Sequence, residues 1–333
     1  MAGSQKQKFL ALLQILYEQT DESHPLSAPQ LIEILAAKGI QCERKAIYRD
    51  VESLVDFGFD ILQSTYPQGY FWGRRLFEMP ELRLLVDSIK SSEFITEKKT
   101  DEMIDKLRHL TSIYQGSELD RIKGIAGRPK NRNEGIFYTI DSLHYAIQNK
   151  RKVHFSYYRH MIRGGRIVSQ KSHEFTVSPY ALIWNDGKYY LVANYDKYDN
   201  FSHYRIDRIR QVDVLSESSR PLSQFSRYDE IFDENDYLGG VFGMYAGSYE
   251  DYVYLRCSSE CLEHLIDRFG QDITCEACDD RFFTVRIKAV VSEGLVSWIL
   301  AQRGGVRAVY PPELADKVRS TLSGMLAQYD NFL

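Results

Sequence analysis

The feature that most constrains the fold is a tight-turn signal at residues 185–187, placed between two short apolar runs. In Asn185-Asp186-Gly187, a glycine follows two residues of types that tolerate left-handed backbone conformations. A turn of this composition favours a hairpin between the flanking strands. The runs at 180–184 and 188–193 are rich in aromatic and aliphatic residues, which suit strands. The pattern therefore predicts an antiparallel hairpin.

Further strands are expected beside this hairpin. Val153, Phe155 and Tyr157 alternate with polar residues, as a half-buried strand requires, and residues 199–202 have the composition of another turn. Five short strands joined by turns between residues 150 and 218 predict a small β-barrel.

The region 1–75 predicts a winged helix-turn-helix. Ser27 followed by Gln30 is a capping-box signal at the start of a second helix. A third helix is expected to end at Gly58, and the turn at 66–69 predicts a small hairpin after it. Three short helices followed by a hairpin is the plan of a winged helix.

A helical linker at 76–149 and a C-terminal domain at 245–333 complete the predicted organisation. Residues 78–115 have helical apolar spacing, residues 116–135 have the composition of a linker, and 136–149 predict one more helix. The C-terminal pattern of strand, helix, strand, strand, helix, strand and helix is typical of a ferredoxin-like domain. The predicted class is therefore α+β multidomain.

The third helix of the first domain carries the candidate DNA-binding face. Ile47, Val51 and Leu54 share one side at 100° per residue and are expected in the core. Arginine can bind guanine bidentately in the major groove, and lysine or tyrosine can hold phosphates. The alternative is a solvated basic face. The candidate DNA-binding residues are Arg44, Lys45, Tyr48 and Arg49.

Charge is unevenly distributed along the chain. The 42 basic and 46 acidic residues give a net charge of −4, which is not a nucleic-acid signature for the whole chain. Residues 120–170 hold 11 basic and 3 acidic residues, whereas 221–333 hold 10 and 18. An anion is therefore expected to bind at the middle of the chain rather than near its end.

Two stretches resemble parts of known bacterial regulators. The segment Ile47-Tyr48-Arg49-Asp50-Val51 resembles the recognition helix of DeoR-like winged-helix regulators, with Ala46 where that family usually has Thr. The stretch 177–193, together with 203–209, closely resembles the WYL domain of transcriptional regulators. The three residues that name this domain fall on Tyr189, Tyr190 and Leu191, the first being Tyr in place of Trp.

The resemblance covers nearly the whole chain, including the C-terminal extension often found in these proteins. It implies a homodimeric transcriptional regulator that binds a double-stranded DNA operator. It also implies that the barrel is a small one of the Sm or SH3 kind. In the family this barrel is expected to sense an anionic effector, a nucleotide or single-stranded nucleic acid, and to alter DNA binding.

The barrel residues agree with an anionic effector. His203, Arg205 and Asp207 are expected to alternate on one face of a strand, and the arginine offers a planar fork suited to phosphate. Nearby tyrosines would stack on a base or donate a hydroxyl. The candidate ligand-binding residues are Tyr157, Tyr180, Tyr190, His203, Arg205 and Arg208.

A purely structural role for some of these residues stays open as an alternative. At least one of Tyr189 and Tyr190 is expected to pack in the barrel, and the Asp207-Arg208 pair would serve equally as an intradomain ion pair. The main alternative function is a nucleic-acid-binding module that acts through the barrel, with the winged helix used for protein contacts. An enzyme that processes nucleotides at the barrel lacks a recognisable nucleophile or metal site, so no enzyme is expected.

Neither a cofactor nor a metal is expected. Four C-terminal cysteines have spacings that would allow a zinc site. One is expected at a strand end, one in a helix and one within a strand, and the first two strands of a ferredoxin-like domain are not neighbours. Free buried thiols, which act as small apolar residues, are therefore favoured. With Cys42 the total of five is odd, which fits a reducing compartment. No run of 18 uncharged apolar residues and no signal-peptide core occur, so a cytoplasmic protein is expected. The four are Cys257, Cys261, Cys275 and Cys278.

Overall fold

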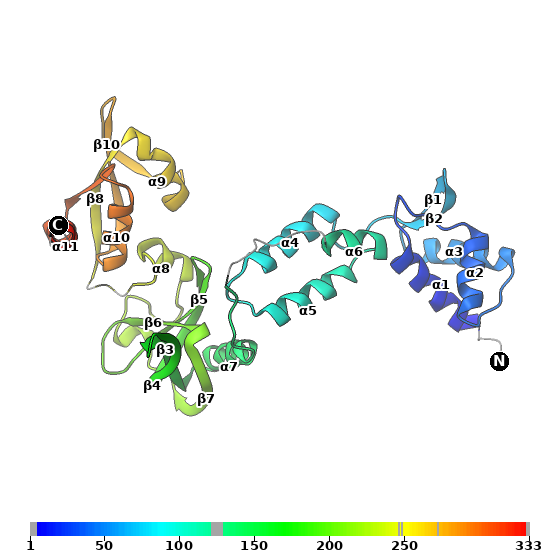
Figure 1. Ribbon diagram of the computed structural model, residues 1–333, viewed down its shortest axis with the longest axis horizontal. Helices are drawn as coiled ribbons and strands as arrows, with labels where there is room; N and C mark the ends of the chain where they lie inside the picture. The colour runs from blue at the N-terminus through cyan, green and yellow to red at the C-terminus, as the bar shows by residue number, and fades with distance from the viewer. Residues whose placement is uncertain (1–4, 121–128, 246, 248, 272, 331–333) are drawn as a thin grey trace. The chain divides into compact units, whose positions relative to one another are not determined.

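The structure is a computed structural model that describes residues 5–120, 129–245, 247, 249–271 and 273–330. The chain divides into two compact units, Met1–Glu134 and Gly135–Leu333. Mixed helices and antiparallel sheets in both units confirm the predicted α+β class (Figure 1).

The first unit begins with three helices and a two-stranded hairpin, the arrangement of a winged helix. Fully buried leucines and isoleucines from all three helices form its core. Gly58 ends the third helix in left-handed backbone, at φ 111°, as its sequence position predicts. The elements are α1 Gln5–Gln19, α2 Ala28–Ala37, α3 Arg44–Phe57, β1 Ile61–Thr65 and β2 Gln68–Trp72.

Three further helices follow with a small core of their own, formed by Leu82, Val86, Ile104 and Leu119. They are α4 Met79–Ser91, α5 Glu97–Arg108 and α6 Ile113–Asp120. The region 78–115 is thus broken into separate helices. The prediction of a linker from 116 is wrong for 116–120, because Leu119 is buried and these residues continue α6; residues 121–128 of that linker lie outside the described residues.

The second unit begins with a helix on a five-stranded antiparallel sheet. The strand order is β6-β5-β4-β3-β7, and α7 packs on β3, β4 and β7, so this helix belongs with the sheet. The predicted division of the chain into four domains at 1–75, 76–149, 150–218 and 245–333 stays a prediction. The elements are α7 Ile136–Gln148, β3 Arg151–Arg163, β4 Arg166–Asn185, β5 Lys188–Asn194, β6 Phe201–Arg205, η1 Ile206–Arg208 (a 3₁₀ turn) and β7 Ile209–Ser218.

The prediction of five short strands is wrong for two of them. β3 has 13 residues and β4 has 20, and their far ends pair only with each other. β5 does follow the predicted turn, with Asp186 and Gly187 both at positive φ.

A connecting segment then leads to the C-terminal domain. The segment contains η2 Leu222–Gln224 and α8 Glu234–Gly240. The sheet of the last domain has the order β11-β8-β10-β9, which is the predicted ferredoxin-like topology. Its apolar face packs on helices α9, α10 and α11. The elements are β8 Glu250–Ser258, η3 Ser259–Cys261, α9 Leu262–Phe269, β9 Thr274–Cys278, β10 Phe282–Val290, α10 Glu293–Ala301, β11 Val306–Tyr310 and α11 Pro312–Asp330.

Candidate nucleic-acid interface and effector site

The basic face of α3 is exposed to solvent and takes no part in the core of the winged helix. Ile47, Val51 and Leu54 are buried, as expected, while the four candidate DNA-binding side chains are exposed on the other side. The Arg44 guanidinium lies over the Tyr48 ring, 5.5 Å from its centroid, and its Nε donates to the tyrosine hydroxyl. This contact orders two of the four side chains and leaves the rest pointing to solvent.

Asp50 takes a structural role, as its side of the helix suggests. It is buried and its carboxylate lies 2.7 Å from the Lys8 ammonium, so it ties α3 to α1. A buried carboxylate requires such a partner. Asp50 is therefore no part of the exposed face.

The hairpin beside α3 is fixed to the loop before α2. Leu26 and Tyr70 exchange two backbone hydrogen bonds, of 2.9 Å and 2.8 Å, which form an isolated antiparallel bridge at the edge of the hairpin. Gly69 is required here because a Cβ at this position would come within 2.6 Å of the Leu26 backbone. Tyr70 lies edge-on to Tyr48, with ring centroids 6.4 Å apart, so the hairpin borders the basic face.

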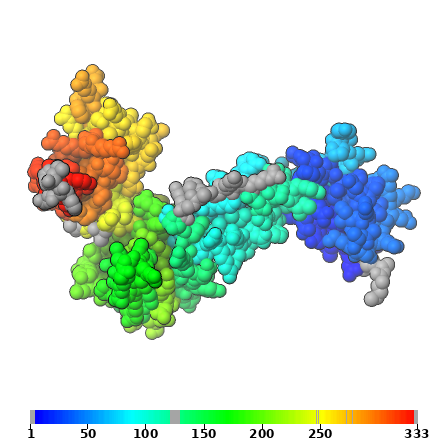
Figure 2. Space-filling model, viewed as in Figure 1, coloured from blue at the N-terminus to red at the C-terminus, as the bar shows by residue number. Residues whose placement is uncertain are grey.

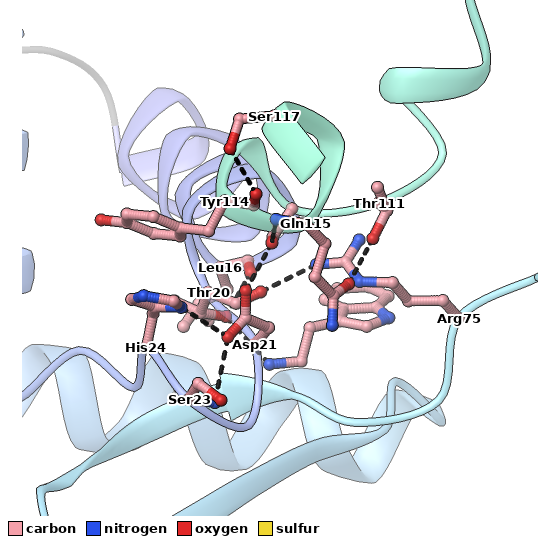
Figure 3. Close-up of polar contacts among 12 residues, drawn as sticks. Leu16, Thr20, Asp21, Ser23, His24, Arg75, Thr111, Tyr114, Gln115 and Ser117 are labelled. Atoms are coloured by element: carbon pink, nitrogen blue, oxygen red, sulfur yellow. Dashed lines mark hydrogen bonds and ion pairs between the residues drawn. The ribbon is translucent and has the colours of Figure 1, made fainter. Parts of the chain in front are cut away.

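A buried carboxylate joins the winged helix to α6 (Figure 3). Asp21, in the loop after α1, accepts hydrogen bonds from the Ser112 hydroxyl at 2.5 Å and from the Ser23 backbone at 3.0 Å. Its other contact is His24 Nδ1, at 2.8 Å. Burial alone would raise the pKa of Asp21, but the hydrogen bonds from Ser112 and His24 outweigh it and lower the pKa.

Two further contacts strengthen this junction. The His24 ring stacks on Tyr114 of α6, with centroids 3.8 Å apart and planes at 8°. Arg75, which follows β2, donates to the carbonyls of Tyr17 and Thr20 at 2.7 Å and 2.8 Å. We refer to Asp21, His24, Ser112 and Tyr114 as the Asp21 cluster.

In the second unit, Arg205 makes a two-pronged ion pair with Asp207. Its Nε and a terminal nitrogen lie 3.1 Å and 2.7 Å from the two carboxylate oxygens. The prediction that His203, Arg205 and Asp207 alternate on one strand is wrong at its last member, because β6 ends at Arg205 and Asp207 lies in η1. The tight turn lets Ile206 stay fully buried and brings the carboxylate back onto the arginine.

Two of the candidate tyrosines lie next to Arg205. Tyr190 is its cross-strand neighbour on β5, so both side chains are on the same face of the sheet. The Tyr157 hydroxyl accepts a hydrogen bond from the Arg205 backbone N–H at 3.2 Å. Arg208, three residues further, is half-buried, and its Nε is buried without a hydrogen-bond partner. The structure thus brings Tyr157 and Tyr190 to Arg205, and it places Arg208 at the end of the 3₁₀ turn that follows.

His203 and Tyr180 have partners elsewhere. His203 Nε2 lies 2.6 Å from the Tyr237 hydroxyl, and burial lowers its pKa to about 4, so the imidazole is neutral near pH 7. The Tyr180 hydroxyl donates to the Arg220 carbonyl at 2.6 Å, and burial raises its pKa to about 12. Both side chains are therefore neutral near pH 7, and each has a hydrogen-bond partner within the second unit.

The sequence did not indicate which part of the chain packs on the face of β5 and β6 that carries His203. Residues 225–245, most of which lie between the predicted domains, contribute Phe225, Tyr228 and Tyr237 to an aromatic cluster around Phe201. These rings line an open pocket of about 370 Å³. The density of aromatic residues between 225 and 245 was the available signal.

The C-terminal cysteines lie apart from any metal-like cluster. Cys257 and Cys261 are buried, Cys275 and Cys278 are exposed, and burial raises the pKa of Cys257 to about 12. Within the described residues, no three His, Cys, Asp or Glu side chains are placed to hold a metal ion. None of the described helices is both long and apolar enough to cross a membrane.

Two domains of the second unit match known protein families. A WYL domain matches residues 138–214 and a WCX domain matches residues 250–326. The first match spans α7 and most of the five-stranded sheet, and the second spans the ferredoxin-like domain. The chain therefore carries a WYL domain followed by a WCX domain, which confirms the WYL resemblance found in its sequence.

Among solved structures, the chain is similar to proteasome accessory factor B/C (PafBC) of Arthrobacter aurescens, at 15% identity and a TM-score of 0.29. The similarity covers 99% of this chain and 50% of that chain, so this chain spans half the length of that relative. The comparison with curated proteins gave no match.

Proposed function

We propose that this protein is a DNA-binding transcriptional regulator whose WYL domain senses an anionic effector, a nucleotide or single-stranded nucleic acid. The observation that carries the proposal is the exposed basic face of α3, bordered by the hairpin. A helix of this kind enters the major groove and contacts base edges with its N-terminal residues. Arg44 and Lys45 stand in the first turn of α3, where such contacts are made.

A single winged helix with a net charge of −1 over residues 1–75 has little general attraction for DNA. We therefore propose a homodimer, in which two recognition helices bind two half-sites and supply the missing affinity. Sedimentation of the free protein and of its DNA complex would test this stoichiometry.

The test of DNA binding is fluorescence anisotropy with duplex DNA from the gene's own promoter region, at several salt concentrations. Arg44→Ala/Arg49→Ala should weaken binding at least tenfold and reduce the salt slope by about 1 to 2, since each phosphate contact contributes about 0.9. Lys98→Ala/Lys106→Ala is the matched control, because it removes two exposed charges from α5. Equal binding by wild type and the α3 variant would contradict the proposal.

The effector site is proposed around Arg205, with Tyr190 and Arg208 beside it. Arg205 already faces a carboxylate, so an anionic effector would compete with Asp207 for the guanidinium. His203 is assigned to positioning through Tyr237, since a neutral imidazole adds no charge. The effector proposal thus makes the Arg205–Asp207 pair a contact that opens on binding.

Competition gives opposite effects for the two partners. Arg205→Ala should abolish binding of a single-stranded oligonucleotide or nucleotide probe, whereas Asp207→Asn should tighten it. A pair that serves structure alone would lower thermal stability in both variants and leave probe binding unchanged. That second result would remove the effector site from this face.

A further inference from the structure

The long hairpin formed by the ends of β3 and β4 stands free of the rest of the sheet. The pairing of β3 with β7 ends at Tyr157, and β4 pairs with β5 only from Ser178 onward. Beyond Tyr157 a register shift interrupts the ladder, and six cross-strand pairs follow to the tip. At about 3.4 Å per residue this two-stranded arm extends roughly 20 Å. Figure 2 shows the green residues of this region uncovered on the face turned to the viewer.

The backbone of the arm is well specified at both ends. Gly164 and Gly165 form the tip turn, with φ of 54° and 75°, which only glycine adopts readily. At the base, the Ser172 hydroxyl donates to the Tyr157 carbonyl at 3.0 Å, next to the register shift. Such a bulge increases the twist of a ribbon and redirects it. The arm is therefore an ordered projection.

One face of this arm gathers three arginines. Residues two apart on a strand share a face, and so do directly paired residues of an antiparallel ladder. Arg163 pairs with Arg166, and Arg159 lies on the same face, across from Gln170. All three side chains are exposed, and the described residues give them no ion-pair partner. Residues 158–171 contain no acidic residue.

Directly opposed like charges destabilise a ladder, so the Arg163–Arg166 pair has a cost in the free protein. An anionic partner with regularly spaced charges would remove this cost. A two-stranded ribbon also has the dimensions that the major groove admits, about 12 Å in width. Arginine forks suit phosphate oxygens, which line both edges of that groove.

We propose that the β3–β4 arm is a second DNA-contacting element, which lays its arginine face along the phosphates of duplex DNA. This inference rests on the proposed DNA-binding function and extends it to the WYL domain. The contact is with phosphates, so it adds affinity and salt dependence without sequence preference.

The test compares three variants of the full chain on the same promoter duplex. Arg159→Gln/Arg163→Gln/Arg166→Gln should weaken duplex binding at least tenfold and reduce the salt slope by roughly 2 to 3. Arg281→Gln/Arg303→Gln/Arg307→Gln, which removes three exposed charges from the C-terminal domain, should leave both quantities unchanged. Arg163→Lys/Arg166→Lys keeps the charge and should retain most of the slope.

The outcomes separate this inference from the function on which it rests. Wild-type duplex binding by the arm variant would overturn the arm and leave the winged helix untouched. Loss in the arm variant, with none in Arg44→Ala/Arg49→Ala, would support the arm and refute the recognition helix. Loss of single-stranded oligonucleotide binding alone, or equal losses in the C-terminal control, would also overturn the duplex contact.

Discussion

His203 is a buried side chain whose charge state matters for stability. Its imidazole is neutral in the folded protein because burial lowers the pKa to about 4, while an unfolded histidine titrates near 6.5. Between these values the unfolded chain binds more protons than the folded chain. Protonation therefore favours unfolding as the pH falls from about 6.5 toward 4.

The expected result is a loss of unfolding free energy at low pH that depends on this one residue. From pH 7.5 to pH 5 wild type should lose about 2 kcal/mol through His203, a loss that His203→Gln should not have. Denaturant unfolding at the two pH values measures the difference. An identical pH dependence in both proteins would mean that the imidazole is already protonated or solvated when folded.

The Asp21 cluster makes a second prediction at this scale. Ser112→Ala removes a buried donor to a buried carboxylate and should destabilise the first unit by about 1 to 3 kcal/mol. Ser117→Ala is the control, because the Ser117 hydroxyl is exposed and bonds to the Tyr114 carbonyl one turn earlier (Figure 3). Thermal unfolding of the two variants, compared with wild type, gives the answer; equal melting shifts would contradict a specific role for Ser112.

At the scale of elements, the sequence predicted the features that depend on neighbouring residues, such as helix caps and turns. The capping box is present, with the Ser27 backbone N–H donating to Gln30 Oε1 at 2.8 Å, and the ferredoxin-like strand order follows the predicted element order. The length of the arm escaped prediction because residues 158–171 lack apolar–polar alternation, with adjacent apolar pairs at 161–162 and 167–168, and both of its faces are largely exposed. Asp207 was misplaced because alternation across 203–207 does not distinguish a strand from a 3₁₀ turn that also buries Ile206.

The candidate sites also differ in how far the sequence could predict them. Exposure of the α3 face follows from helical periodicity and was predictable. The partners of His203 and Tyr180 are Tyr237 and Arg220, which lie 34 and 40 positions further along the chain, and no local pattern indicates such contacts. The roles of all ten candidate residues in binding stay predictions until the variants are measured.

The hairpin of the winged helix depends on one small residue. Gly69→Ala would place a methyl group 2.6 Å from the Leu26 backbone, so the hairpin must separate from the loop before α2. We expect a loss of about 1 to 3 kcal/mol and weaker DNA binding. Gly324→Ala is the control, because nothing lies within 4 Å of that Cβ and alanine favours a helix such as α11. Unchanged stability of Gly69→Ala would mean that the hairpin does not pack on this loop.

At the scale of the whole molecule, two compact units predict more than one unfolding transition. Leu255→Ala, in the C-terminal core, should lower one calorimetric transition by the roughly 2 to 5 kcal/mol typical of such cavities. Ser112→Ala should lower a different one. A single transition that both variants shift equally would show that the units unfold together.

The Asp21 cluster also decides where the chain can be cut and rejoined. A winged helix excised after β2 would leave Asp21 and His24 without Ser112 and Tyr114, whereas a segment that retains the chain through Glu134 keeps both partners. An exchange of the winged helix between proteins of this architecture should therefore include α4, α5 and α6. The transferable segment is nearly twice as long as the winged helix alone.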